Sequence, residues 1–255
     1  MPTVARFNVT PVKATVLQHP ERLRFERYGV PGNREFLFVD ETGRHIGGTK
    51  AGILQQIRSA FDPERDELSL TFPDGTVATG PAEGGKPIDA RFSRRSVAGR
   101  LVEGPWTQPL AKHAGRPLRL VRVEHPGDAN DVRPVTLVSL ESVEELSRRG
   151  EREHPVDAGR FRMTIEIEGV SEPHEEDTWE GTHVRIGEAV LLLEGAVPRC
   201  VVTTLDPESG LRDFPTLSVI KHYRGENDDG LPFGVYADVI EPGDARVGDR
   251  LQPLA

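Results

Sequence analysis

Short stretches in which apolar and polar residues alternate recur along the whole chain. Met163, Ile165 and Ile167 alternate with polar side chains, and residues 235–240 show a similar pattern. A period of two is typical of strands that bury one face. The 26 glycines and 21 prolines separate these stretches from one another. Many short strands with close turns predict a mainly β fold of the barrel or sandwich kind, rather than repeated strand–helix–strand units.

Turn chemistry predicts two hairpins in the first half of the chain. Residues 68–72 and 76–78 flank Pro73-Asp74-Gly75, and residues 35–40 run into the turn at 41–43. Proline, aspartate and glycine favour such turns because proline fixes its own φ and glycine tolerates positive φ.

Helices are predicted to be few. The clearest covers residues 140–149, with Ser139 as its N-cap, arginines at its end and Gly150 directly after it. Each of these residue types stabilises the helix end at which it stands. Shorter helices are predicted at 106–113 and 217–223.

A polar stretch containing proline and glycine, residues 124–131, follows the apolar strand predicted at 118–123. Such a change of composition is typical of a connection between structural units. We therefore expect two β-rich, barrel-like units, residues 1–123 and residues 124–255.

The charge and cysteine content limit the possible partners. Lys and Arg number 32 against 41 Asp and Glu, so the net charge of −9 predicts neither nucleic acid nor anionic lipid as a partner. No apolar run approaches the ~20 residues of a membrane span. The N-terminal residues lack the apolar core of a signal peptide, and a single cysteine forms no internal disulfide, so a cytoplasmic location is expected. That single cysteine also excludes a four-cysteine iron–sulfur cluster.

Cys200 is the most informative residue for function. It follows Arg199 and precedes two valines and two threonines. A thiol at this position offers a soft metal ligand beside a cation that binds anions. Free cysteine is also among the most buried residue types, and the local sequence alone favours a structural role by about two to one.

A series of motifs in order resembles the two-part MOSC family, named for the C-terminal domain of molybdenum cofactor sulfurase. Its members include the mitochondrial amidoxime-reducing component and bacterial relatives. The motifs span nearly the whole chain. They are TPVK at 10–13, GNREFLFVD at 32–40, GRFRMTI at 159–165, EEDTW at 175–179 with Ile186-Gly187, RCVVTTLDPESG at 199–210, FGVY at 233–236 and ARVGD at 245–249.

The resemblance implies a molybdenum cofactor, a molybdopterin with or without a nucleotide. It makes Cys200 both the metal ligand and the catalytic residue, and a soft thiolate suits such a metal. The family motifs place cofactor-binding cations at Lys13, Arg34, Arg162 and Arg199, with Ser139, Thr164 and Tyr236 as polar contacts. Charged donors from distant segments suit the cofactor's phosphate.

The chain departs from the family pattern at three positions. Ala14 stands where the family has serine, Thr164 where it has asparagine, and Pro198 where the reducing components have serine. Each change removes a hydrogen bond to the cofactor. We expect binding to persist, because charge-assisted contacts outweigh neutral ones. The resemblance says less about the substrate range and activity of this protein than about cofactor binding.

The function implied by the resemblance is reduction of N-oxygenated small molecules, such as hydroxylamines, amidoximes and N-hydroxylated bases. Because the chain has no iron–sulfur, haem or flavin motif, a separate protein such as a ferredoxin or a flavin reductase would donate the electrons. Two alternatives stay open: a sulfur carrier with a persulfide on Cys200, and a non-catalytic module that binds or stores the cofactor. Molybdenum analysis of the purified protein separates the sulfur carrier from the other two.

Overall fold

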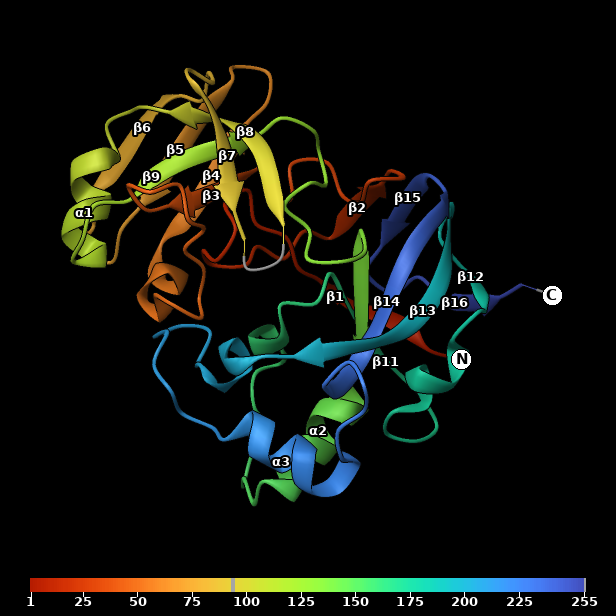
Figure 1. Cartoon of the computed structure of the whole chain (residues 1–255). Helices are drawn as coiled ribbons and strands as arrows, with labels where there is room; N and C mark the ends of the chain where they lie inside the picture. Colours follow the sequence, from red (N-terminus) through yellow and green to blue (C-terminus); the bar gives the residue numbers. More distant parts are fainter. Residues whose placement is uncertain (93–94, 255) are drawn as a thin grey trace.

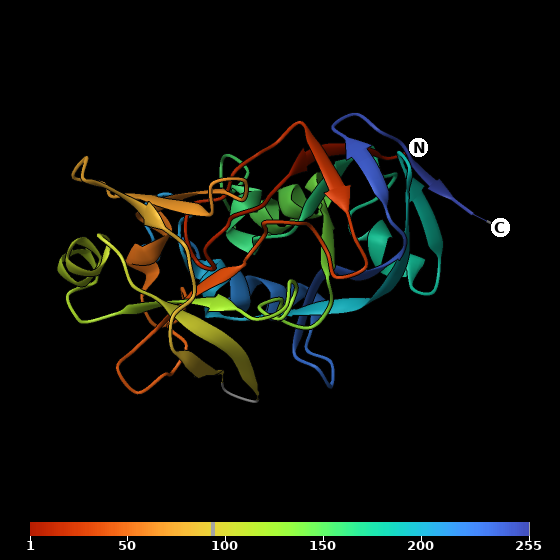
Figure 2. The ribbon, with the colours of Figure 1, turned by 90° about the horizontal axis from the view of Figure 1, so that it is seen from above.

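The computed structural model describes residues 1–92 and 95–254, and its fold is mainly β, as predicted. Four sheets and three α-helices make up the regular structure of the described residues. Figure 1 shows smaller sheets formed by the first half of the chain beside one larger sheet. Figure 2, seen from above, shows the same separation. Within the described residues, no helix combines the length and the apolar character needed to cross a membrane.

The larger sheet has seven strands in the order β1-β11-β10-β14-β13-β12-β16. Neighbouring strands run antiparallel except for β10 and β11. One face carries a continuous apolar core. The strands are β1 (Thr3–Phe7), β10 (Val135–Ser139), β11 (Ile165–Glu168), β12 (His183–Ile186), β13 (Ala189–Arg199), β14 (Leu231–Glu241) and β16 (Leu251–Pro253).

The first half of the chain builds a four-stranded sheet, β3-β9-β8-β7, and a three-stranded sheet, β4-β5-β6. A second apolar core, which includes Trp106, lies among these strands. The strands are β3 (Phe36–Val39), β4 (Arg58–Asp62), β5 (Glu67–Thr71), β6 (Val77–Pro81), β7 (Pro87–Arg91), β8 (Ser96–Val102) and β9 (Arg119–Val123).

One predicted hairpin is confirmed and the other is wrong. Strands β5 and β6 pair antiparallel around the turn at residues 73–75. Strand β3 instead pairs with the distant strand β9, and only an isolated bridge from Val39 to His45 returns after the turn at 41–43. Strand β3 is buried on both faces, so a partner from elsewhere in the core stabilises it better than a short exposed return segment.

All three predicted helices exist. Helix α2 (Leu140–Arg149) has the predicted bounds, and the Ser139 side chain accepts a hydrogen bond from the Ser142 amide at 3.2 Å. Helices α1 (Thr107–Ala114) and α3 (Thr216–Arg224) lie within one residue of prediction. Helices α2 and α3 pack on one another and share a core with β13 and β14 (Figure 1). Four 3₁₀ turns complete the fold: η1 (Gly52–Gln56), η2 (Ala158–Phe161), η3 (Glu175–Trp179) and η4 (Val201–Thr204).

The sheets do not follow the predicted division at residues 123 and 124. Strand β1 pairs with β11 of the larger sheet. Strand β2 (Arg22–Phe25) pairs with β15 (Gly243–Arg246) near the end of the chain. The first 25 residues therefore supply strands to the unit formed mainly by the second half, because their apolar side chains complete its core.

Candidate functional site: a cationic cavity beside an exposed thiol

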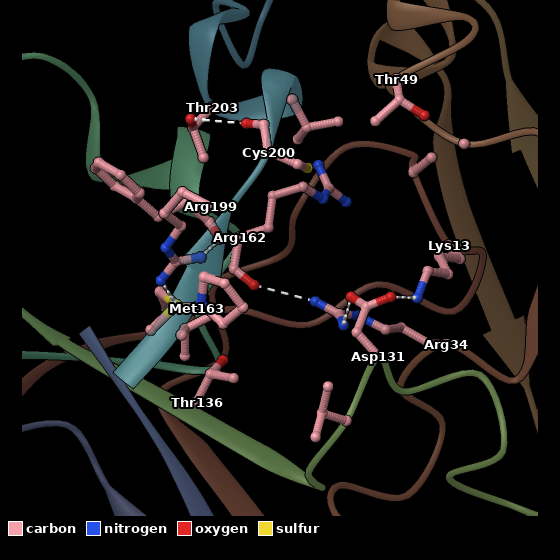
Figure 3. A pocket seen from close by; sticks show the side chains of 18 of the residues that line it. Lys13, Arg34, Thr49, Asp131, Thr136, Arg162, Met163, Arg199, Cys200 and Thr203 are labelled. Atoms are coloured by element: carbon pink, nitrogen blue, oxygen red, sulfur yellow. Dashed lines mark hydrogen bonds and ion pairs between the residues drawn. The ribbon is translucent and has the colours of Figure 1, made fainter. Parts of the chain in front are cut away.

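A cavity of about 390 Å³ lies between the two halves of the molecule. Figure 3 shows side chains from both halves pointing into it. Of the residues proposed from sequence, six line this cavity: Lys13, Arg34, Arg162, Arg199, Cys200 and Tyr236. Segments that lie far apart along the chain therefore converge on one volume.

Strained backbone positions several of these residues. Ala14, Arg34 and Arg162 have φ values of 79°, 57° and 53°, in the left-handed region. Side chains other than glycine adopt this region at a cost, so it persists only where surrounding contacts fix it. The Arg34 amide donates to the Thr10 carbonyl at 2.7 Å, and the Arg34 side chain donates to the Arg162 carbonyl at 3.0 Å (Figure 3). This second bond joins the two halves at the cavity.

Asp131 pairs with two of the cations at one side of the cavity. Its Oδ1 lies 2.6 Å from Lys13 Nζ, and its Oδ2 lies 3.6 Å from Arg34 Nη1. Burial lowers the pKa of Lys13 to about 8, although Asp131 opposes the shift. Desolvation acts to raise the pKa of Asp131, but Lys13 and Arg34 outweigh it and hold that pKa at about 2. Part of the positive charge is thus neutralised by the chain itself.

Arg162 and Arg199 have no carboxylate partner among the residues that the structure describes. Arg162 donates to the Thr15 carbonyl at 2.7 Å, and Arg199 donates to the carbonyls of Phe233 and Phe161 at 2.8 and 3.2 Å. Burial lowers the pKa of Arg162 to about 9 and that of Arg199 to about 10. Two partly buried cations with only neutral acceptors form a site that a bound anion would stabilise.

The turn after β13 presents Cys200 to the cavity. Cys200 is exposed, so the structural interpretation of a buried thiol is wrong. Its carbonyl accepts hydrogen bonds from the amide and hydroxyl of Thr203 at 3.1 and 3.0 Å. The Thr203 carbonyl in turn accepts from the fully buried Arg160 at 3.1 Å, and Asp213 binds Arg160 at 2.9 Å. The buried Arg160, paired with a carboxylate at the surface, therefore holds the backbone that carries the thiol.

Two residues predicted as polar cofactor contacts do not line the cavity. The Ser139 hydroxyl donates to the buried Glu176 carboxylate at 2.8 Å, besides capping α2. Thr164 is buried, and its amide donates to the Thr136 hydroxyl at 3.0 Å. Thr136 itself lines the cavity. The Thr164 hydroxyl lies 3.4 Å from that of Thr136, so Thr164 is one residue removed from the cavity, and its role and that of Ser139 stay predictions.

The structure adds cavity residues that the sequence did not indicate, among them His45, Gln55, Phe92 and Asp131. The His45 ring stacks on Phe92 with centroids 4.3 Å apart, and its Nδ1 lies 3.2 Å from the Phe38 carbonyl. Burial and then the nearby Lys13 charge lower the pKa of His45 to about 4, so the ring is neutral at pH 7. These residues reach the cavity through packing between distant segments, and no local sequence pattern indicates their position there.

Replacing Ser139 by alanine is expected to destabilise the fold by about 1–2 kcal/mol, because α2 loses its cap and Glu176 loses a donor. Retention of the molybdenum cofactor that the resemblance implies should not change, since Ser139 does not line the cavity. Urea unfolding and metal analysis of the same preparation measure both quantities. A variant with unchanged stability and less bound molybdenum would place Ser139 at the cofactor after all.

The fold and the cavity define a class of protein in which two β-rich units enclose a cationic site beside an exposed thiol. The model of the MOSC domain matches residues 113–252, and the chain belongs to this family. Mitochondrial amidoxime-reducing component 1 of Mus musculus is 36% identical over 261 residues, covering 89% of this chain and 74% of that protein. The Danio rerio protein of the same name is 29% identical over 237 residues, covering 83% of this chain and 70% of that protein. The solved YuaD protein of Bacillus subtilis superposes with a TM-score of 0.49 at 17% identity, covering 98% of this chain and 93% of that chain.

Proposed function

We propose that this protein binds a molybdenum cofactor in the cavity and reduces N-oxygenated small molecules, with Cys200 as the metal ligand. The observation that carries the proposal is the pair of partly buried arginines, Arg162 and Arg199, that line the cavity without a carboxylate partner among the described residues and lie beside an exposed thiol. The names of the related amidoxime-reducing components support the same reaction class.

The residues present fit such a cofactor. In the described part of the chain, no group of three or more His, Cys, Asp or Glu side chains could hold a metal ion. A single thiolate therefore suits a metal that brings most of its ligands on an organic molecule, as a molybdopterin does. Its phosphate would be held by Arg162 and Arg199, and by Lys13 and Arg34 at the other side of the cavity.

When bound, the cofactor would supply the chemistry that removes oxygen from the N–O bond. The chain's own residues would bind and orient the two molecules. Burial raises the pKa of Tyr236, so its hydroxyl stays protonated near pH 7 and can donate a hydrogen bond. Arg199 and Cys200 are adjacent, so one turn would hold the anionic part and the metal of the same cofactor.

Electrons would come from a separate protein, such as a ferredoxin or a flavin reductase, and we retain the cytoplasm as the proposed location.

The exposure of Cys200 also keeps a second function under consideration, a sulfur carrier with a persulfide on this thiol. Stoichiometric molybdenum and dye-driven reduction of a panel of N-hydroxylated compounds would support the reductase. Labile sulfur without metal would support the carrier, and bound cofactor without turnover would indicate a storage module.

Replacing Asp131 by asparagine is expected to tighten binding of inorganic pyrophosphate to the cofactor-free protein by about tenfold, because the carboxylate no longer competes for Lys13 and Arg34. Calorimetry at fixed ionic strength measures the affinity. Asp128→Asn is the matched control, since Asp128 lies in the same loop and forms no ion pair with the described residues. Weaker binding in the Asp131 variant would show instead that this carboxylate holds the cations in place.

A further inference from the structure

Gln55 is a buried polar side chain at the cavity whose amide nitrogen has no partner. It lies in η1 and is 1% exposed. Its Oε1 lies 3.5 Å from Arg162 Nη1, and its Nε2 has no hydrogen-bond partner among the described residues. A buried donor left unsatisfied costs about 1–3 kcal/mol, so such a group calls for an explanation.

The orientation of the amide follows from its neighbour. A guanidinium group can only donate, so the side of the amide that faces Arg162 must be the oxygen. The nitrogen therefore faces away from Arg162. A Cβ atom placed on Gly48 would lie 3.8 Å from Gln55 Nε2 and 2.9 Å from Val202 Cγ2. Gly48 therefore lies beside the buried nitrogen, and Val202 of the turn after Cys200 packs against Gly48.

The chemistry of this donor differs from that of the other cavity donors. Lys13, Arg34, Arg162 and Arg199 are cations and suit a phosphate. The Gln55 amide is neutral and suits an uncharged acceptor, such as the oxygen of an amidoxime or an N-oxide. Gln55 also belongs to none of the motifs on which the family resemblance rests.

We propose, on the basis of the function proposed above, that Gln55 Nε2 donates a hydrogen bond to the N–O oxygen of the substrate. Gln55 is then a substrate-binding residue that places this oxygen beside the Cys200 turn. Its Oε1 faces Arg162 Nη1 at 3.5 Å. One amide would thereby separate the neutral part of the site from its charged part.

The test is calorimetric binding of benzamidoxime to the protein as purified, with molybdenum content measured on each preparation. Gln55→Met removes the donor and keeps the length of the side chain. We expect its affinity to fall about tenfold at unchanged molybdenum content, since about one neutral hydrogen bond is lost. Gln55→Glu keeps the acceptor toward Arg162 but replaces the donor by an oxygen, and we expect at least as large a loss. Gln56→Met is the matched control, because Gln56 Nε2 donates to the Ser209 carbonyl at 2.7 Å and does not line the cavity.

Affinity within twofold of wild type in both Gln55 variants would overturn the proposal, as would equal losses in the Gln55 and Gln56 variants or no binding by the wild type. Loss of molybdenum with unchanged affinity would also overturn it, since the amide would then contact the cofactor. Retained affinity in Gln55→Glu alone would show that Gln55 acts through Arg162, and this outcome too rejects the substrate contact. If the wild type binds benzamidoxime through Gln55 but does not reduce it with a dye as donor, the proposed reductase function fails while this contact stands.

Discussion

With the function proposed above, Cys200→Ala is expected to lower the rate of benzamidoxime reduction to below about 1% of the wild-type rate, because the chain has no other cysteine to serve as a thiolate ligand. The free energy of unfolding should change by less than about 0.5 kcal/mol, since the side chain is exposed and its removal leaves no core cavity. Single-turnover kinetics and urea unfolding measure the two effects separately.

Cys200→Ser is the matched variant for this experiment. It keeps the size of the side chain but offers a harder donor than a thiolate, so activity should be lost as in the alanine variant. Wild-type turnover in the alanine variant would exclude an essential thiolate. Loss of labile sulfur in either variant, with no molybdenum in the wild type, would favour the sulfur carrier.

Replacing both Arg162 and Arg199 by methionine is expected to reduce cofactor retention by at least about 100-fold. Each guanidinium would contribute charge-assisted hydrogen bonds of about 1.5–3 kcal/mol to the anionic group. Molybdenum content after exhaustive dialysis measures the retention. The single variants should each lose about tenfold or more, because each removes one unpaired cation.

Arg133→Met is the control for the loss of positive charge at the cavity. Arg133 also lines the cavity, but it forms ion pairs with Asp238 and Glu194. Its charge is therefore already balanced within the protein, and its removal should affect retention less than removal of Arg162 or Arg199. Equal losses in all three single variants would show that retention depends on the overall charge of the cavity and not on the unpaired arginines.

The elements best predicted from the sequence are those whose signals are local. Helix α2 has a capping serine before it, arginines in its last turn and a glycine after it, and its bounds agree with prediction. The hairpin of β5 and β6 depends on a three-residue turn. The partner of β3 could not be predicted, because β9 lies some 80 positions away and only burial on both faces selects it.

The residues of the candidate site likewise fall into those that local motifs predict and those that only long-range contacts reveal. The cations and the thiol were found because they belong to motifs, and they line one cavity. Asp131 and Gln55 were missed, because their importance comes from contacts with Lys13 and Arg162 across 118 and 107 positions of sequence. Ser139 stays a predicted cofactor contact: it does not line the cavity, and its hydroxyl caps α2 and donates to Glu176.

The pairing of β1 and β2 with strands of the second half bears on how this protein can be divided. The segment matched by the MOSC model begins at residue 113 and so omits both strands. A fragment cut there would expose the edges of β11 and β15 and remove Phe7 and Phe25 from the core. Unpaired edges of this kind promote aggregation. The stretch of sequence matched by the family model is therefore smaller than the paired unit seen in this structure, and we expect gene fusion or exchange between relatives to succeed better when the first 25 residues are carried along.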